Sequence, residues 1–137
     1  MDQRLSLVTL VVADLGATRR FYLDGLGWES YLDVPGEVLM FQVGPHLVLS
    51  LWDEKAALDE IGPVLRGGTP PVTLAHNVGR PDEVDAVLDD ARRAGAPTIG
   101  DAVEREWGGY SGYFTDPDSF LWEVAFAPGP LGELVVP

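Results

Sequence analysis

The chain has 137 residues, which is the length of one domain or of two very small modules that share a core. Nine Lys and Arg residues stand against 22 Asp and Glu residues, and the net charge of -13 disfavours nucleic acid and anionic membrane surfaces as partners, because both attract clustered positive charge. The absence of cysteine excludes disulfides, thiolate nucleophiles and cysteine zinc sites, and two histidines are too few for an imidazole-rich metal centre.

The first half of the chain predicts one helix among four strands. Asp14 is placed to cap the helix, and Gly25 and Gly27 are placed to end it. The Gly-Pro pair at 44–45 predicts a tight hairpin. The expected elements are a strand over 5–12, a helix over 15–26, and strands over 28–32, 38–43 and 46–52.

The second half predicts a similar succession after a linker. The Gly- and Pro-rich run at 67–71 is typical of a linker. Pro81 suits the first turn of a helix, and Gly95 suits its end. The expected elements are a short acidic helix over 54–61, a strand over 72–78, a helix from Pro81 to Gly95, an extended segment from 97 towards 106, strands over 110–115 and 120–126, and a Pro- and Gly-rich tail.

The two halves therefore share the order β-α-β-β-β. Asp14 precedes Gly27 by 13 residues, and Asp82 precedes Gly95 by 13. This spacing indicates an internal duplication of about 50 to 60 residues, or else two helices of similar length that both end in glycine. We expect an α+β fold in which two βαβββ modules form curved mixed sheets around a central cleft. The single domain would comprise module one (about 5–52), a linker (53–71), module two (about 72–127) and a C-terminal tail (128–137).

Two sequence segments resemble a known family. They are VTLVVADLGATRRFYLDGLGW at 8–28 and GYFTDPDSFLWEVAF at 112–126. With the β-α-β-β-β order, they resemble the vicinal oxygen chelate superfamily, which includes glyoxalase I, bleomycin-resistance proteins, fosfomycin-resistance enzymes and ring-cleaving (extradiol) dioxygenases. The resemblance covers about residues 5–127. Ser119 replaces the glycine that is usual in the family's turn, so it takes either a strained φ or another turn type.

The resemblance implies one divalent metal, bound from the first and fourth strands of each module. Carried over by position, the ligands fall at Leu7, Ser50, Thr73 and Glu123. Leu7 cannot bind a metal, and the neutral hydroxyls of Ser50 and Thr73 are poor ligands for the usual divalent ions. Only Glu123 matches, so we expect no metal and no other cofactor.

A metal bound by Glu123 and one histidine is the alternative. His76 lies three residues beyond Thr73, and an odd offset on a strand places it on the opposite face. His46 shares the parity of Ser50, but four residues span about 13 Å along a strand. A β-bulge could change either parity.

Alternation along the strands predicts which side chains line the cleft. By parity with Glu123 they are Thr9, Val11, Val48, Ser50, Thr73, Tyr113 and Leu121, with Trp52 at a strand end. Trp107 and Tyr110 flank two glycines beside the hairpin that leads to Tyr113. Aromatic side chains suit a planar ligand, or they fill a packed and closed cleft. The candidate ligand-binding residues are Thr9, Ser50, Trp52, Thr73, Trp107, Tyr110, Tyr113 and Leu121.

Two charged side chains are candidates for chemistry. Glu123 lies on an apolar strand, where it acts as a general acid or base, binds a cationic group, or is an inherited carboxylate paired with a hydroxyl or water. Arg105 either neutralises an anionic group of a substrate or belongs to a solvated edge strand. Glu123 is the candidate catalytic residue.

The sequence thus favours metal-independent binding of a small aromatic or cationic molecule, as in the bleomycin-resistance branch. The alternatives are a metal-dependent lyase, isomerase or ring-cleaving dioxygenase with Glu123 as a ligand, an acid-base enzyme that uses Glu123, or a degenerate member that acts through a protein partner. No apolar run reaches the roughly 18 residues of a membrane span and no signal peptide is visible, so we expect a cytoplasmic protein. The family resemblance implies a homodimer.

Overall fold

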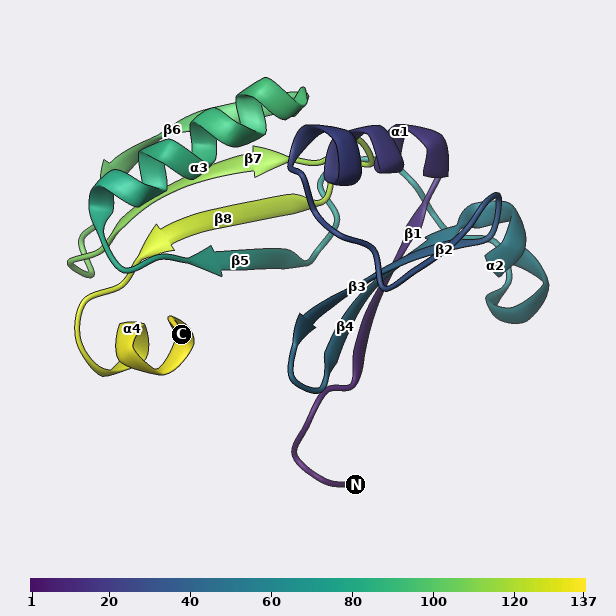
Figure 1. The fold of residues 1–137 in the computed structure, drawn as a ribbon, viewed down its shortest axis with the longest axis horizontal. Coiled ribbons are helices and arrows are strands. Elements are labelled where there is room, and N and C mark those ends of the chain that lie inside the picture. The colour runs from purple at the N-terminus through teal and green to yellow at the C-terminus, as the bar shows by residue number, and fades with distance from the viewer. The chain divides into compact units, whose positions relative to one another are not determined.

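Each half of the chain folds into a four-stranded mixed sheet with a helix packed on one face (Figure 1). The computed structural model describes residues 1–137, which divide into two units, Met1–Arg66 and Gly67–Pro137. The first unit contains β1 (Leu7–Val12), α1 (Leu15–Arg19), the π-helical η1 (Arg20–Gly25), β2 (Leu32–Val34), β3 (Val38–Gly44), β4 (Leu47–Asp53) and α2 (Glu54–Ile61). The second contains β5 (Thr73–Asn77), α3 (Pro81–Ala94), β6 (Thr98–Glu104), β7 (Tyr110–Thr115), β8 (Leu121–Phe126) and α4 (Pro130–Val135).

The two sheets have the same topology. Their strand orders are β1-β4-β3-β2 and β5-β8-β7-β6. In each sheet the first strand runs parallel to the fourth, and the remaining neighbours are antiparallel. The predicted α+β class with two βαβββ modules is confirmed.

In the first unit the helix begins and ends as its sequence predicts. The carboxylate of Asp14 accepts a hydrogen bond from the backbone N–H of Ala17 at 2.9 Å, which caps α1. The chain leaves η1 through Gly27 at a φ of 70°. The ring of Tyr22, fully buried, lies 5.7 Å from that of Phe41 on β3. The helix therefore covers the face of the first sheet that carries Phe41.

In the second unit α3 packs closely on β7. Pro81 occupies the first turn, and Gly95 ends the helix at a φ of 91°. A Cβ added to Gly112 would stand 2.6 Å from the Cδ1 of the buried Leu88, so the glycine makes room for this side chain of the helix. The stacked rings of Phe114 and Trp122, whose centroids are 6.0 Å apart, lie on the same side as Gly112 in the strand register. This side of the sheet is the core of the unit.

Two expectations about local structure were wrong. The strand expected at 28–32 lies instead at Leu32–Val34. The ring of Trp28 packs against Tyr22 and Phe41, and the backbone at this position is not part of the sheet. The first strand begins at Leu7 and not at residue 5. The Pro- and Gly-rich tail forms the short helix α4, whose buried Gly132 lies against the backbone carbonyl of Ala127.

The turn before β8 takes a positive φ at a residue other than glycine. Ser119 has a φ of 69°, which is the strained alternative of the two that its sequence position left open. The carboxylate of Asp116, 1% exposed, accepts hydrogen bonds from the backbone N–H groups of Asp118 and Phe120, each at 3.0 Å. These bonds hold Ser119 in its conformation.

None of the helices combines the length and the apolar character that crossing a membrane requires.

Candidate functional site

The candidate residues divide according to the face of the sheet on which they lie. We call the face of each sheet opposite its helix the helix-distal face. Strand alternation and the registers place on it Thr9, Ser50 and Trp52 in the first unit, and Thr73, Tyr113, Leu121 and Glu123 in the second. Tyr110 lies on the other face, towards α3, and Trp107 lies in the hairpin between β6 and β7.

Glu123 and Tyr113 form a hydrogen-bonded pair on the helix-distal face of the second sheet. They are direct cross-strand partners on β8 and β7, and the Tyr113 hydroxyl donates to Glu123 Oε1 at 2.7 Å. This hydrogen bond, helped by partial burial and by the negative charge of Glu123, raises the pKa of Tyr113 above its usual value, whereas the positive charge of Arg105 opposes the rise. The phenol thus stays protonated and serves as a fixed donor to the carboxylate.

Arg105 completes the group. Its Nε donates to the hydroxyl of Ser111 at 2.9 Å, and its Nη2 donates to the carbonyl of the same residue at 3.0 Å. Its Cζ lies 5.6 Å from the centroid of the Tyr113 ring, a cation–π distance. Ser111 is fully buried, so the guanidinium is anchored on a rigid part of the sheet. We call these four residues the Arg105–Glu123 cluster.

A β-bulge puts Arg105 on this face. Gly100 pairs with Tyr113 and Val103 pairs with Ser111, so three steps along β6 match two along β7. Arg105 has the parity of Val103 and therefore shares the face of Ser111. Without the bulge, the preceding glutamate would take that face, and Arg105 would point towards α3. The sequence gives no signal for the bulge, and the cluster was therefore not predicted.

The internal repeat relates the four positions at which the family resemblance places metal ligands. Ser50 lies between Thr9 and Met40 on its neighbouring strands, as Glu123 lies between Ala75 and Tyr113. Ser50 is thus the counterpart of Glu123 in the first unit. By the same registers Leu7, which pairs with Val48, is the counterpart of Thr73, which pairs with Leu121.

The donor atoms at these positions do not fit a divalent metal. A leucine and two neutral hydroxyls accompany a single carboxylate, one oxygen of which already accepts the Tyr113 hydroxyl. His76 pairs with the fully buried Val124, on the face opposite to that of Glu123. No three His, Asp or Glu side chains converge as a metal ion would require. The chemistry open to Glu123 is therefore hydrogen bonding, ion pairing or proton transfer.

Trp107 is held at the tip of the hairpin between β6 and β7. Trp107 is 55% exposed, and its indole lies across Gly109, where an added Cβ would stand 1.7 Å from a ring atom. The hairpin closes through hydrogen bonds from the N–H of Arg105 to Gly109 and from the N–H of Gly108 to Arg105, both 2.8 Å. The tip thus offers an exposed aromatic surface, and these backbone hydrogen bonds also hold the main chain of Arg105 in place.

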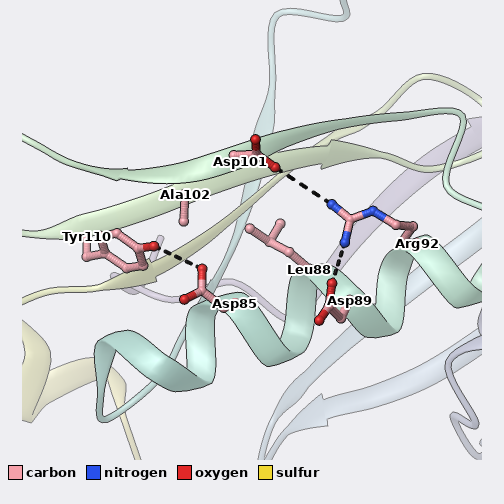
Figure 2. A pocket seen from close by; sticks show the side chains of 7 residues that line it. All are labelled: Asp85, Leu88, Asp89, Arg92, Asp101, Ala102 and Tyr110. Atoms are coloured by element: carbon pink, nitrogen blue, oxygen red, sulfur yellow. Dashed lines mark hydrogen bonds and ion pairs between the residues drawn. The ribbon is translucent and has the colours of Figure 1, made fainter.

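Tyr110 lines a different hollow. Figure 2 shows this pocket of about 190 Å³ between α3 and the strands β6 and β7. The Tyr110 hydroxyl donates to Asp85 at 2.9 Å, and this hydrogen bond raises the pKa of Tyr110. The lining residues are Asp85, Leu88, Asp89, Arg92, Asp101, Ala102 and Tyr110.

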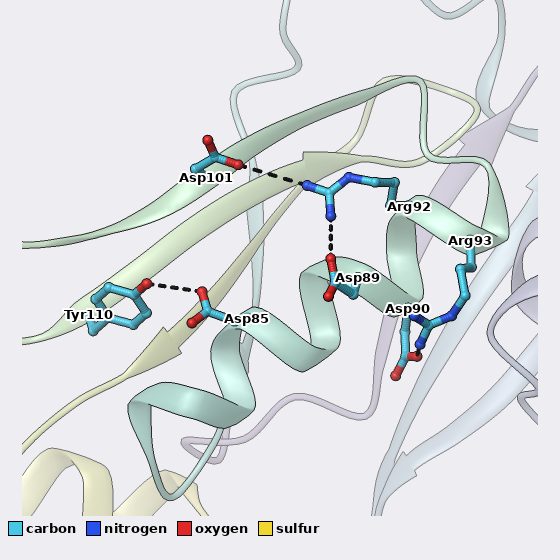
Figure 3. Close-up of polar contacts among 7 residues, drawn as sticks. All are labelled: Asp85, Asp89, Asp90, Arg92, Arg93, Asp101 and Tyr110. Carbon is cyan, nitrogen blue, oxygen red and sulfur yellow. Dashed lines mark hydrogen bonds and ion pairs between the residues drawn. The ribbon is translucent and has the colours of Figure 1, made fainter.

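The charges around this pocket pair with one another. Arg92 forms an ion pair with Asp89 on α3 and lies 3.8 Å from Asp101 on β6, and Figure 3 shows this pairing beside the Asp90–Arg93 pair. The contacts of Arg92 and Tyr110 connect α3 to β6 and β7, which is a structural role. The structure therefore separates Tyr110 from Tyr113 and Glu123.

Two βαβββ units, each with its fourth strand between the first and third, define a recognisable class of proteins. The chain belongs to the Glyoxalase/Bleomycin resistance protein/Dioxygenase superfamily, whose sequence pattern matches residues 4–124. The family resemblance stated from the sequence is confirmed. No match was found among proteins of curated function.

Solved structures carry the likeness over almost the whole chain. A glyoxalase-related enzyme from Fulvimarina pelagi is 32% identical, with a TM-score of 0.82 over 92% of this chain and 89% of that one. Lactoylglutathione lyase from Agrobacterium tumefaciens is 26% identical, with a TM-score of 0.70 over 92% and 95%. The fosfomycin resistance protein FosX from Mesorhizobium loti is 19% identical, with a TM-score of 0.69 over 98% of both chains, and shares the fold.

Proposed function

We propose that the protein binds a small molecule with a positive charge and a planar ring, and that it does so without a metal. The carboxylate of Glu123 is the anchor for the cation. Tyr113, Leu121 and Thr73 lie on the same helix-distal face of the second sheet, and the exposed Trp107 at the tip of the hairpin between β6 and β7 is the candidate aromatic contact.

The observation that carries this proposal is that only one oxygen of the Glu123 carboxylate is hydrogen-bonded within the chain. One oxygen accepts the Tyr113 hydroxyl, which fixes the orientation of the group, and no residue of the chain binds the other. Ala75, its register partner on β5, adds only a methyl group to this face. An oriented and half-exposed carboxylate of this kind suits an ammonium or amidinium group. The net charge of -13 favours the approach of a cation over long distances.

The test uses isothermal titration of protein pretreated with a chelator. The probe is phenethylamine, which combines an ammonium group with one ring. We expect saturable binding to the wild type and an affinity at least about tenfold lower for Glu123→Gln, because a hydrogen bond between charged groups is lost. Glu60→Gln is the matched control, since it removes one exposed carboxylate from α2 and should leave binding unchanged. Equal affinities for Glu123→Gln and the wild type would refute the proposal.

Proton transfer by Glu123 is a second candidate function. It is favoured by one observation, the 2.7 Å hydrogen bond between a carboxylate and a phenol on the same helix-distal face. A catalysed reaction would appear as exchange of an acidic C–H proton of a bound carbonyl compound with deuterated water. Exchange that requires Glu123 and no added metal would support the enzyme, whereas binding without exchange supports the binding protein.

We also propose that the protein forms a homodimer, as the family resemblance implies. The apolar side chains exposed on α4 are consistent with a docking role, and they are Leu131, Leu134 and Val135. Sedimentation equilibrium measures the mass directly, and a single species at 14.8 kDa would refute the dimer.

A further inference from the structure

We infer that the ligand is a small zwitterion, and that Arg105 binds its anionic group while Glu123 binds its cationic group. The inference rests on the proposed function, since it takes Glu123 as the cation anchor. It adds a second ligand-binding residue and narrows the class of ligand to molecules that carry an ammonium and a carboxylate close to a ring.

The first step is that Arg105 has no carboxylate partner in a protein with a large excess of carboxylates. Arg4 and Lys55 also lack such a partner, but both are exposed to solvent. Arg105 is half-buried, and its contacts in the chain are with Ser111 and the Tyr113 ring. The basic residues that do form ion pairs are Arg19, Arg20, Arg66, Arg80, Arg92 and Arg93.

The second step concerns the desolvation of the Arg105 guanidinium. A half-buried cation has lost part of its hydration and gains from an anion placed against it. The faces of the Tyr113 ring and the dipoles of Ser111 compensate only part of the charge, because neither carries a full negative charge. A ligand carboxylate would supply the missing charge.

The third step is geometrical. Nε and Nη2 of Arg105 are both held by Ser111, so the guanidinium plane is fixed, while Nη1 has no partner in the chain. The Tyr113 ring contacts this guanidinium, and its hydroxyl contacts Glu123 at the other end. One side chain thus separates a fixed positive group from a fixed negative group on one face of the sheet. This arrangement complements a molecule with opposite charges a few bonds apart.

The experiment compares three probes that differ by one group each. They are phenylalanine, phenethylamine, which lacks the carboxylate, and 3-phenylpropionate, which lacks the ammonium. For the wild type we expect phenylalanine to bind about ten times more tightly than phenethylamine, the gain of one charge-assisted hydrogen bond. Arg105→Gln should abolish this difference by weakening the binding of phenylalanine, and it should not weaken the binding of phenethylamine, which has no carboxylate.

Two further variants separate the loss of the Arg105 charge from a general effect of substitution. Arg105→Lys retains the charge and should recover part of the preference for phenylalanine even if the glutamine variant folds poorly. Arg4→Gln removes an exposed arginine without an ion pair and should change nothing.

The results separate the two proposals. Equal binding of phenylalanine and phenethylamine to the wild type, or an equal loss of both in Arg105→Gln, overturns the zwitterion inference and leaves the cation anchor standing. Failure of all three probes to bind the wild type contradicts the proposed function, and the zwitterion inference fails with it.

Discussion

Ser50 and Glu123 occupy equivalent places in the two units, each on the fourth strand, facing away from the helix, between one residue of the first strand and one of the third. The strand register is the same in both units, but the chemistry is not. Ser50 is 3% exposed and neutral, whereas Glu123 is half-buried and charged. The repeated fold therefore provides two similar surfaces, and only the second carries charges suited to an ionic ligand.

Removal of the Tyr113 hydroxyl tests how much its hydrogen bond to Glu123 contributes to the stability of the fold. Tyr113→Phe keeps the ring beside Arg105 and deletes only the donor to the carboxylate. We expect a loss of about 1 kcal/mol in the free energy of unfolding, measured with urea, because the hydrogen bond to a charged acceptor is partly exposed. Tyr31→Phe is the matched control, since Tyr31 is 71% exposed, and it should be neutral. A Tyr113→Phe protein as stable as the wild type would show that the hydrogen bond contributes nothing to folding.

The close approach of α3 to β7 predicts a large effect at Gly112. A methyl group there would lie 2.6 Å from Leu88 Cδ1 and 3.1 Å from the backbone of Ala102, so the buried Leu88 side chain must change its rotamer or α3 must shift. Gly112→Ala should cost about 1–3 kcal/mol in unfolding free energy, as overpacked cores do. In Gly100→Ala, on the neighbouring β6, the nearest atom to the new Cβ is 3.9 Å away, and we expect little change. Similar urea midpoints for the two variants would contradict the packing argument.

Much of the framework was predictable because local signals agree with the fold. Asp14 and Gly95 mark helix ends by capping chemistry that acts within a few residues, and the acidic helix expected over 54–61 is α2, Glu54–Ile61. Alternation then placed Thr73, Tyr113 and Glu123 on one face, since a strand leaves only two choices.

The charged cluster was not predictable for a physical reason. One extra residue between Gly100 and Val103 exchanges the faces on which Glu104 and Arg105 lie. No residue type in this segment indicates the register shift. The helix-distal face therefore carries the guanidinium of Arg105, where alternation alone would have placed the carboxylate of Glu104. Tyr110 differs, because its odd offset from Tyr113 could have assigned it to the face of α3 from the sequence.

The positive φ of Ser119 predicts a stabilising substitution. At 69° a side chain with a Cβ is strained, and Ser119→Gly removes that strain while the Asp116 hydrogen bonds to the turn remain. We expect a gain of about 0.5–1 kcal/mol, because the added freedom of glycine in the unfolded chain offsets part of the relief. Ser30→Gly, at an exposed position without a positive φ, should lose stability instead. Thermal unfolding of the pair measures both signs, and a Ser119→Gly protein that melts below the wild type would contradict the strain argument.

The raised pKa of Tyr113 predicts a loss of stability in alkali that depends on Glu123. The pKa of the folded phenol lies above the ordinary 10.0 chiefly because its proton is shared with the carboxylate. A raised folded pKa means that the stabilising contribution is complete below pH 10 and declines as the pH rises through the folded pKa. The stability difference between the wild type and Tyr113→Phe should thus be constant from pH 7 to 9 and shrink above about pH 10.

The control for this pH dependence is the second hydrogen-bonded phenol. The pKa of Tyr110 is raised in the same way by Asp85, so Tyr110→Phe should remove its own alkaline contribution and leave that of Tyr113 in place. In Glu123→Gln the alkaline step of Tyr113 should move back towards its ordinary pH, because the acceptor has lost its charge. Urea unfolding at intervals from pH 7 to about 11 resolves these steps. An alkaline step that is unchanged in both Tyr113→Phe and Glu123→Gln would show that the pair does not titrate as one unit.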